Sequence, residues 1–126
     1  MSKILIVEDN EKNMKLVRDI LQHLGHATLE ASTGAEGVRL ALAESPDLIL
    51  MDIQLPDIDG IEVLRRIRAE PSLDATPVAA VSASVMPDEQ QKIAASGFDA
   101  FVAKPINLKQ FREMVQRCLA AGRQSS

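Results

Sequence analysis

The order of apolar and polar residues predicts short strands that alternate with longer helices. Short apolar runs are typical of strands, whereas apolar residues spaced three or four apart are typical of amphipathic helices. A segment with helical spacing follows each apolar run, for example through Met14, Val17 and Leu21. The expected strands are residues 3–7, 27–31, 48–51, 77–81 and 101–103.

Five such strand–helix units predict a doubly wound α/β domain with a parallel sheet. Parallel strands need crossover connections, which are right-handed and place helices on both faces of the sheet. The run at 48–51 contains no polar residue. This is expected for a central strand that helices cover on both sides. The longest expected loop is the segment 70–76, before the fourth strand.

Four of the expected strands end on polar residues that suit phosphate chemistry. Glu8 and Asp9 follow the first strand, Asp52 the third, Ser82 the fourth and Lys104 the fifth. The carboxyl ends of neighbouring parallel strands share one edge of the sheet, where open α/β sheets bind ligands. Two adjacent acids after a buried strand are unfavourable unless a cation compensates them. The pattern therefore indicates a divalent metal beside an aspartate that accepts a phosphoryl group.

Each of these residues also has a simpler explanation when it is taken alone. The two acids after the first strand could cap a helix, and Asp52 could be a buried hydrogen-bonding residue. Ser82 could belong to a turn, and Lys104 could be a solvated surface charge. Their joint occurrence favours the site, because carboxylates suit Mg²⁺ and an ammonium suits a phosphoryl oxygen. Pro105 after Lys104 permits a cis peptide, and the sequence leaves the isomer open.

Composition narrows the range of partners. The net charge of −4 and the pI of about 5.1 argue against nucleic acid as a direct partner. No apolar run approaches the roughly 20 residues of a membrane span, which argues against a membrane partner. The single Cys118 cannot form an internal disulfide, which suits a reducing cytoplasm. A chain of 126 residues is long enough for one domain with its own core.

Together these motifs resemble the receiver domains of bacterial two-component response regulators. The resemblance rests on the four polar strand ends and on the segment 52–60, and it covers residues 3–119. It implies a flavodoxin-like (CheY-like) fold, with a five-stranded parallel sheet in the order 2-1-3-4-5 and helices on both faces. Residues 1–121 would form the receiver domain and 122–126 a short polar tail. Within the family, the chain looks most similar to a stand-alone regulator of cell division.

The resemblance also implies a role for each acid at the sheet edge. Asp52 would be the phosphoacceptor. Asp9, Asp52 and the backbone carbonyl of Gln54 would hold Mg²⁺, for which Mn²⁺ can substitute. Glu8 would act on the metal mainly through bound water.

Three further residues would detect the phosphoryl group. Lys104 would pair with one phosphoryl oxygen, and the Ser82 hydroxyl would move to hydrogen-bond another. Phe101 matches the family's switch aromatic, which turns inward when the hydroxyl moves. Ser82 stands where threonine is commoner, and Phe101 where tyrosine is frequent, so this ring has no hydroxyl to donate.

The function implied by the resemblance is that of a single-domain response regulator in a cytoplasmic phosphorelay. A histidine kinase or a histidine phosphotransfer protein would phosphorylate the chain. A downstream protein would bind the fourth helix, fifth strand and fifth helix. The chain would be a monomer or weak homodimer, and it would not be an enzyme beyond self-phosphotransfer and autodephosphorylation.

Two alternative functions share the same residues. A docking module could keep the fold and ignore phosphate, although the intact set of Asp9, Asp52, Ser82 and Lys104 argues against this. A Mg²⁺-dependent phosphohydrolase could form an aspartyl-phosphate intermediate. The haloacid-dehalogenase pattern requires a second aspartate two residues after the nucleophile, and Gln54 occupies that position. A flavin carrier is least expected, since the acidic first loop would repel a phosphate.

Overall fold

The computed structural model describes residues 2–83 and 87–121. Its five strands form one parallel sheet in the order β2-β1-β3-β4-β5. The predicted flavodoxin-like strand order is therefore confirmed. The strands are β1 (Lys3–Val7), β2 (Ala27–Ala31), β3 (Leu48–Asp52), β4 (Val78–Ser82) and β5 (Ala100–Ala103).

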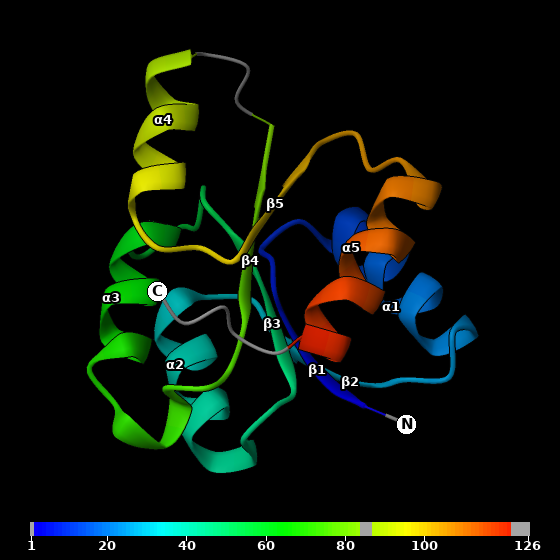
Figure 1. Ribbon diagram of the computed structural model, residues 1–126, viewed down its shortest axis with the longest axis horizontal. Helices are drawn as coiled ribbons and strands as arrows, with labels where there is room; N and C mark the ends of the chain where they lie inside the picture. The colour runs from blue at the N-terminus through cyan, green and yellow to red at the C-terminus, as the bar shows by residue number, and fades with distance from the viewer. Residues whose placement is uncertain (1, 84–86, 122–126) are drawn as a thin grey trace.

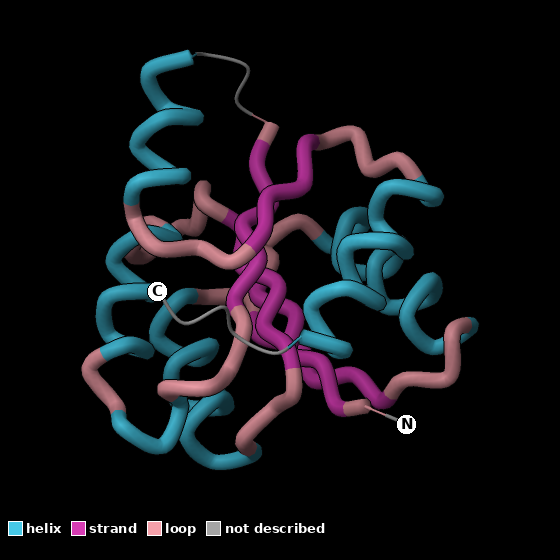
Figure 2. The backbone as a smooth tube through the Cα atoms, in the orientation of Figure 1, coloured by secondary structure: helices cyan, strands magenta, loops and turns pink. Residues whose placement is uncertain are grey.

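Helices cover both faces of this sheet. Figure 1 shows α1 and α5 on one side and α2, α3 and α4 on the other, and Figure 2 shows the twisted strands between these two layers. The helices are α1 (Glu11–His23), α2 (Gly34–Glu44), α3 (Gly60–Arg68), α4 (Pro87–Ala95) and α5 (Leu108–Ala121). Among the described residues, no helix is long and apolar enough to cross a membrane.

Alternate residues of β1 pack into two separate hydrophobic cores. Ile4 and Ile6 lie in the core beneath α1 and α5, and Leu5 and Val7 in the core beneath α2 and α3. Successive strand residues point to opposite faces of a sheet, so a central strand must be apolar throughout. Every residue of β3 and β4 is buried, as the uniformly apolar sequence of the third strand predicted.

The ends of two strands differ from the predicted bounds in a way that matters for the site. β3 continues through Asp52 and β4 through Ser82, because Asp52 pairs with Val81 and Ser82 with Ala103 in the ladder. Both polar residues are therefore part of the hydrogen-bonded sheet. This gives each of them a rigid backbone.

The predicted loop 70–76 is only partly a loop. Pro71–Leu73 form one turn of 3₁₀ helix, labelled η1, in which the Leu73 N–H donates to the Glu70 carbonyl at 3.0 Å. Leu73 is fully buried in the core beneath α2 and α3. The polar tail 122–126 lies outside the described residues.

Candidate functional site

The carboxyl edge of the sheet brings the predicted polar residues together. Glu8 follows β1 directly, and Asp52 ends the neighbouring β3. The Lys104 ammonium lies 3.0 Å from Glu8 Oε1 and 3.3 Å from Asp52 Oδ2. Three residues that are far apart in the sequence thus share one polar cluster.

Three acids at this edge form a candidate metal site. Carboxylate oxygens of Glu8, Asp9 and Asp52 lie within 4.8 Å of one another. Glu8 and Asp52 are only 4% and 3% exposed, whereas Asp9 faces solvent. The Gln54 N–H donates to Asp52 Oδ1 at 3.0 Å, which fixes one side of that carboxylate. Hard carboxylate and carbonyl oxygens are the ligands that Mg²⁺ prefers.

The carboxyl of Glu8 is difficult to ionise in this cluster. Burial, first, and then the hydrogen bond and charge of Asp52 raise the pKa of Glu8 to about 7. Hydrogen bonds from Lys104 and from the Asn10 N–H, the latter at 3.2 Å, oppose this rise only in part. A bound divalent cation favours the ionised form of such a carboxyl, so metal binding releases the proton. The donor set therefore fits a metal ion.

Lys104 is held as a cation within the cluster. Burial opposes its charged form, but the hydrogen bond to Glu8 and the charges of Asp52 and Glu8 outweigh burial and raise the pKa of Lys104. Its backbone N–H donates to the Ser82 carbonyl at 2.9 Å, which joins the end of β5 to the end of β4. The Lys104–Pro105 peptide is cis, the isomer that the sequence left open.

The two predicted switch residues occupy different places. Ser82 is 1% exposed at the carboxyl end of β4. Phe101 on β5 is 40% exposed and lies outside the acidic cluster. Its ring instead lines a groove of about 350 Å³ between β5 and α4, formed with Gln90, Ile93, Ala94, Phe98 and Ala100.

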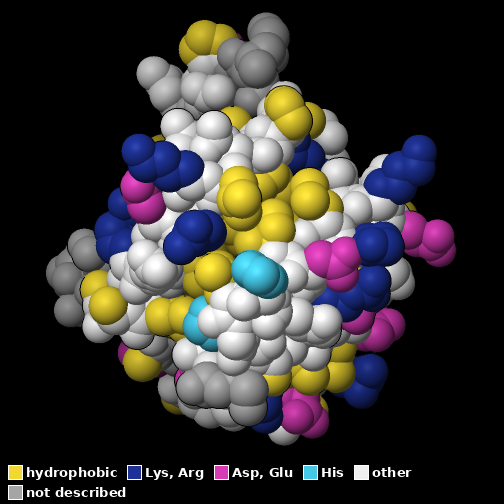
Figure 3. Space-filling view, turned by 90° about the vertical axis from the view of Figure 1, so that its right-hand side faces the viewer, with side chains coloured by type: hydrophobic (Ala, Val, Ile, Leu, Met, Phe, Trp, Pro, Cys, Tyr) yellow, Lys and Arg dark blue, Asp and Glu magenta, His cyan; other side chains and the backbone are white. Residues whose placement is uncertain are grey.

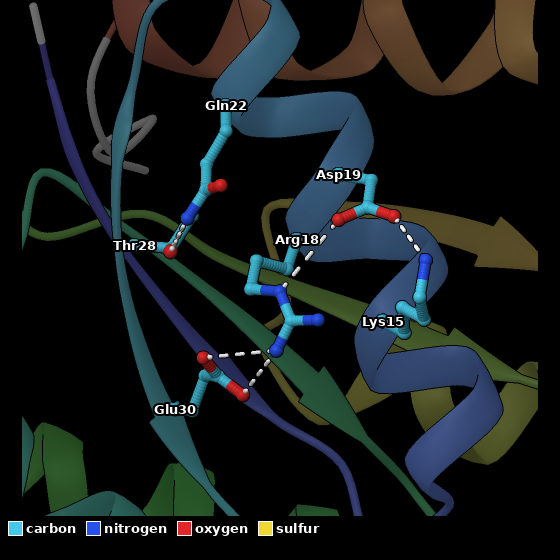
Figure 4. A network of polar contacts seen from close by, with 6 residues as sticks. All are labelled: Lys15, Arg18, Asp19, Gln22, Thr28 and Glu30. Carbon is cyan, nitrogen blue, oxygen red and sulfur yellow. Dashed lines mark hydrogen bonds and ion pairs between the residues drawn. The ribbon is translucent and has the colours of Figure 1, made fainter.

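A hollow of about 550 Å³ lies beside the acidic cluster, between α1, β2 and the start of α2. Three of its lining residues, Lys15, Arg18 and Glu30, belong to the network of polar contacts drawn in Figure 4. Arg18 lies 3.3 Å from Glu30, and Lys15 lies 2.8 Å from Asp19. Among the described residues, no ion pair includes Asp9. Lys15 and Arg18 are therefore paired with other acids, and Lys104 is the cation that contacts the acidic cluster in the described part of the chain.

The face formed by α1 and α5 carries a second hollow. Figure 3 shows apolar side chains gathered there, with histidine side chains beside them. The groove measures about 630 Å³, and its lining mixes apolar and charged residues: Asp19, Ile20, His23, Leu24, Leu108 and Arg112. It is distinct from the acidic cluster, because the two hollows share no lining residue.

Sequence reasoning missed one residue next to the site. No contact was predicted for Asp57, yet its carboxylate accepts hydrogen bonds from two backbone N–H groups at the start of α2. The partners are more than twenty positions away in the sequence. No local pattern could therefore have identified this contact.

A doubly wound parallel sheet with acids and a lysine at its carboxyl edge defines a class of α/β protein whose polar site lies where such sheets bind ligands. The sequence comparison specifies that class. The chain belongs to the response regulator receiver domain family, whose family model matches residues 4–116. The phosphate-indifferent docking module and the phosphohydrolase are not favoured by this membership.

Individual relatives agree with this membership. The chain is 41% identical to the polar-differentiation response regulator DivK of Brucella ovis, over 92% of this chain and 94% of that protein. Among solved structures, it is similar to the receiver domain of the sensor histidine kinase PA1611 from Pseudomonas aeruginosa PAO1. The two structures superpose with a TM-score of 0.89 and are 30% identical in sequence, over 95% of this chain and 98% of that one. The Pseudomonas domain holds a magnesium ion in its active-site cleft.

The chemotaxis branch of the family gives the same fold. The Vibrio cholerae chemotaxis protein CheY4 matches with a TM-score of 0.86 and 26% identity, over 93% of this chain and 98% of that one. The predicted resemblance to receivers and to a stand-alone regulator of cell division is thus confirmed. The roles of the individual site residues stay predictions.

Proposed function

We propose that Asp52 is the phosphoacceptor of this receiver. The observation that carries the proposal is the environment of its carboxylate, which is buried at the end of β3. Oδ1 accepts from the Gln54 N–H at 3.0 Å, and Oδ2 lies 3.3 Å from the Lys104 ammonium. A nucleophile held this way needs no large rearrangement to meet a phosphoryl donor.

The reaction is a transfer between two side chains. An Asp52 oxygen attacks the phosphorus of a donor phosphohistidine, and the O–P bond forms as the N–P bond breaks. The freed imidazole nitrogen retains the electron pair of the broken bond. Such transfer depends on in-line positioning and on neutralised charge rather than on covalent help from the protein. Lys104 would stabilise one phosphoryl oxygen throughout.

Glu8, Asp9, Asp52 and the Gln54 carbonyl would hold Mg²⁺, and Mn²⁺ has the same preference for oxygen ligands. A bound ion would neutralise charge on the transferred phosphoryl oxygens. The close grouping of three carboxylates supports this assignment, as does the pKa of Glu8, which burial and the neighbouring Asp52 raise. Asp9 supplies the exposed carboxylate through which the site stays open to solvent.

Phosphorylation would change the conformation of the β4–β5 side of the site. A phosphoryl group adds about −1.5 to −2 charge and three acceptor oxygens, which favours convergence of Lys104 and Ser82 on Asp52. Movement of Ser82 would leave space for the exposed Phe101 ring to turn inward. Among the described residues, α4 buries only Ile93, so this helix can shift at small energetic cost.

The output of the switch would be protein binding. We assign the α4, β5 and α5 surface to a downstream protein partner, and the phosphoryl donor to a histidine kinase or histidine phosphotransfer protein. Residues 1–121 would form the receiver domain and act in the cytoplasm, as a monomer or weak homodimer. Its catalytic activity would be limited to self-phosphotransfer and autodephosphorylation.

Incubation with acetyl phosphate and Mg²⁺ tests the proposal. Intact mass spectrometry should show a gain of one phosphoryl group, which Asp52→Asn and removal of the metal abolish. Asp59→Asn is the matched control, because it removes a nearby carboxylate while asparagine still caps α3. No gain in the wild-type chain would support a docking module. A gain with rapid turnover of unrelated phosphoesters would support a phosphohydrolase.

A further inference from the structure

The Asp57 side chain makes an unusual long-range contact with the start of α2. Its Oδ1 accepts from the Gly34 N–H at 2.8 Å, and its Oδ2 accepts from the Ala35 N–H at 3.0 Å. Both N–H groups belong to the first turn of a helix, where no intrahelical partner exists and where negative charge is favourable. These bonds lower the pKa of Asp57 to about 2, so the carboxylate is charged at neutral pH.

This contact is additional to the local cap of the helix. Thr33 is the N-cap of α2, and its hydroxyl accepts from the Glu36 N–H at 3.2 Å. A threonine cap is adequate for most helices. Asp57 accepts from two other N–H groups of the same helix end, and these two bonds also attach the segment 53–59 to α2.

That segment leads directly from the proposed phosphoacceptor. It begins after Asp52, carries Gln54, and ends before Gly60, whose N–H donates to the Ile53 carbonyl at 3.0 Å. A Cβ atom at Gly60 would lie 2.6 Å from the Asp52 carbonyl oxygen, so the backbone at the start of α3 is in close contact with the end of β3. The two ends of the segment are thus fixed close together.

The middle of the segment contacts α2 as well as the core beneath α2 and α3. A Cβ atom at Gly34 would lie 2.6 Å from Ile58 Cγ1, so the segment packs against the first turn of α2 without spare room. Asp57 precedes Ile58 and supplies the polar part of the same contact. Without the carboxylate, two helix N–H groups lose their partner and the middle of the segment loses its hydrogen-bonded anchor.

We propose that Asp57 is a positioning residue for the metal site, which holds the segment 53–59 so that the Gln54 carbonyl faces the acidic cluster. The inference rests on the proposed function, in which that carbonyl is a metal ligand. The position of a backbone carbonyl ligand depends on the position of the segment that contains it. Loss of a residue that orients a metal ligand without touching the metal weakens metal affinity. Asp57 itself does not touch the metal or the phosphoryl group.

Calorimetric titration of the chain with MgCl₂ tests this role. Asp57→Ala is expected to weaken Mg²⁺ binding roughly ten-fold, the lower end of the range for loss of an outer partner. In acetyl phosphate assays, the Mg²⁺ concentration for half-maximal rate should rise by the same factor. The rate at saturating Mg²⁺ should stay unchanged, because the acceptor and Lys104 are intact.

Two variants control for simpler effects. Thr33→Ala removes the local cap of the same helix, and Asp59→Asn removes one charge from the same segment. Both should bind Mg²⁺ like the wild-type chain. If circular dichroism shows that Asp57→Ala does not fold, Asp57→Asn, which retains one acceptor oxygen, should give an intermediate affinity.

The outcomes separate this inference from the proposed function. A wild-type chain that fails to bind Mg²⁺ overturns the proposed metal site and the positioning role with it. A wild-type chain that binds Mg²⁺, together with Asp57 variants of equal affinity, overturns the positioning role alone. Equal weakening by Thr33→Ala would also overturn it, since the effect would then come from the stability of α2.

Discussion

Replacing Lys104 with methionine is expected to tighten Mg²⁺ binding and to slow phosphoryl transfer to Asp52. The ammonium lies 3.0 Å from Glu8 and 3.3 Å from Asp52, so it repels a cation bound by the same carboxylates. Its loss should strengthen Mg²⁺ binding about ten-fold, or ~1.4 kcal/mol. The same loss removes a positive charge that faces the transferred phosphoryl group, which should slow transfer by about a hundred-fold.

The opposite directions of these two effects make the prediction specific. Metal affinity is measured by calorimetry, and the transfer rate by the mass gain from acetyl phosphate at saturating Mg²⁺. Lys109→Met removes an exposed charge from α5 and should change neither quantity. A Lys104→Met chain that loses metal affinity and transfer together would instead indicate general disruption of the site.

The stability of the metal-free chain is expected to fall as the pH rises from about 5 to 7. Glu8 has a pKa of about 7 in the folded chain and an ordinary value of 4.5 when exposed. Between these values the folded chain holds a proton that the unfolded chain has released, so stability decreases with pH. The total loss should be no more than about 3 kcal/mol, and it should be complete once the folded Glu8 ionises.

Urea unfolding followed by circular dichroism measures this loss, since the chain has no Trp or Tyr. Saturating Mg²⁺ at about pH 8 should restore much of the stability, because the cation replaces the lost proton as the partner of Glu8. Glu8→Gln should flatten the profile in this pH range. An unchanged slope in Glu8→Gln would show that another group, not Glu8, causes the pH dependence.

Much of the fold could be predicted because local pattern and global architecture agree in this chain. The apolar run of β3 indicated a central strand, and its neighbours β1 and β4 carry two of the other polar ends. The strand that carries Lys104, β5, lies beside β4. Parallel strands align their carboxyl ends, so the strand order placed Glu8, Asp52 and Lys104 at one edge of the sheet. These residues needed only the correct topology to be found.

Other features depend on tertiary contacts that no local pattern carries. The Asp57 carboxylate finds its partners across a sequence separation of more than twenty residues, although its own segment looks like an ordinary turn. The cis isomer of the Lys104–Pro105 bond and the 3₁₀ turn at Pro71–Leu73 are likewise set by their surroundings. The ion pair of Lys104 with Glu8 was not expected, because the lysine was assigned to phosphate rather than to an acid.

The most direct test of the central claim is to identify which side chain carries the phosphoryl group. After incubation with acetyl phosphate and Mg²⁺, borohydride reduction converts an aspartyl phosphate into homoserine, which peptide mass spectrometry locates. We expect homoserine at position 52 in the Mg²⁺-treated chain and at no position when the metal is withheld. A reduced residue at Asp9 instead, or phosphorylation with no reduced residue at position 52, would contradict it.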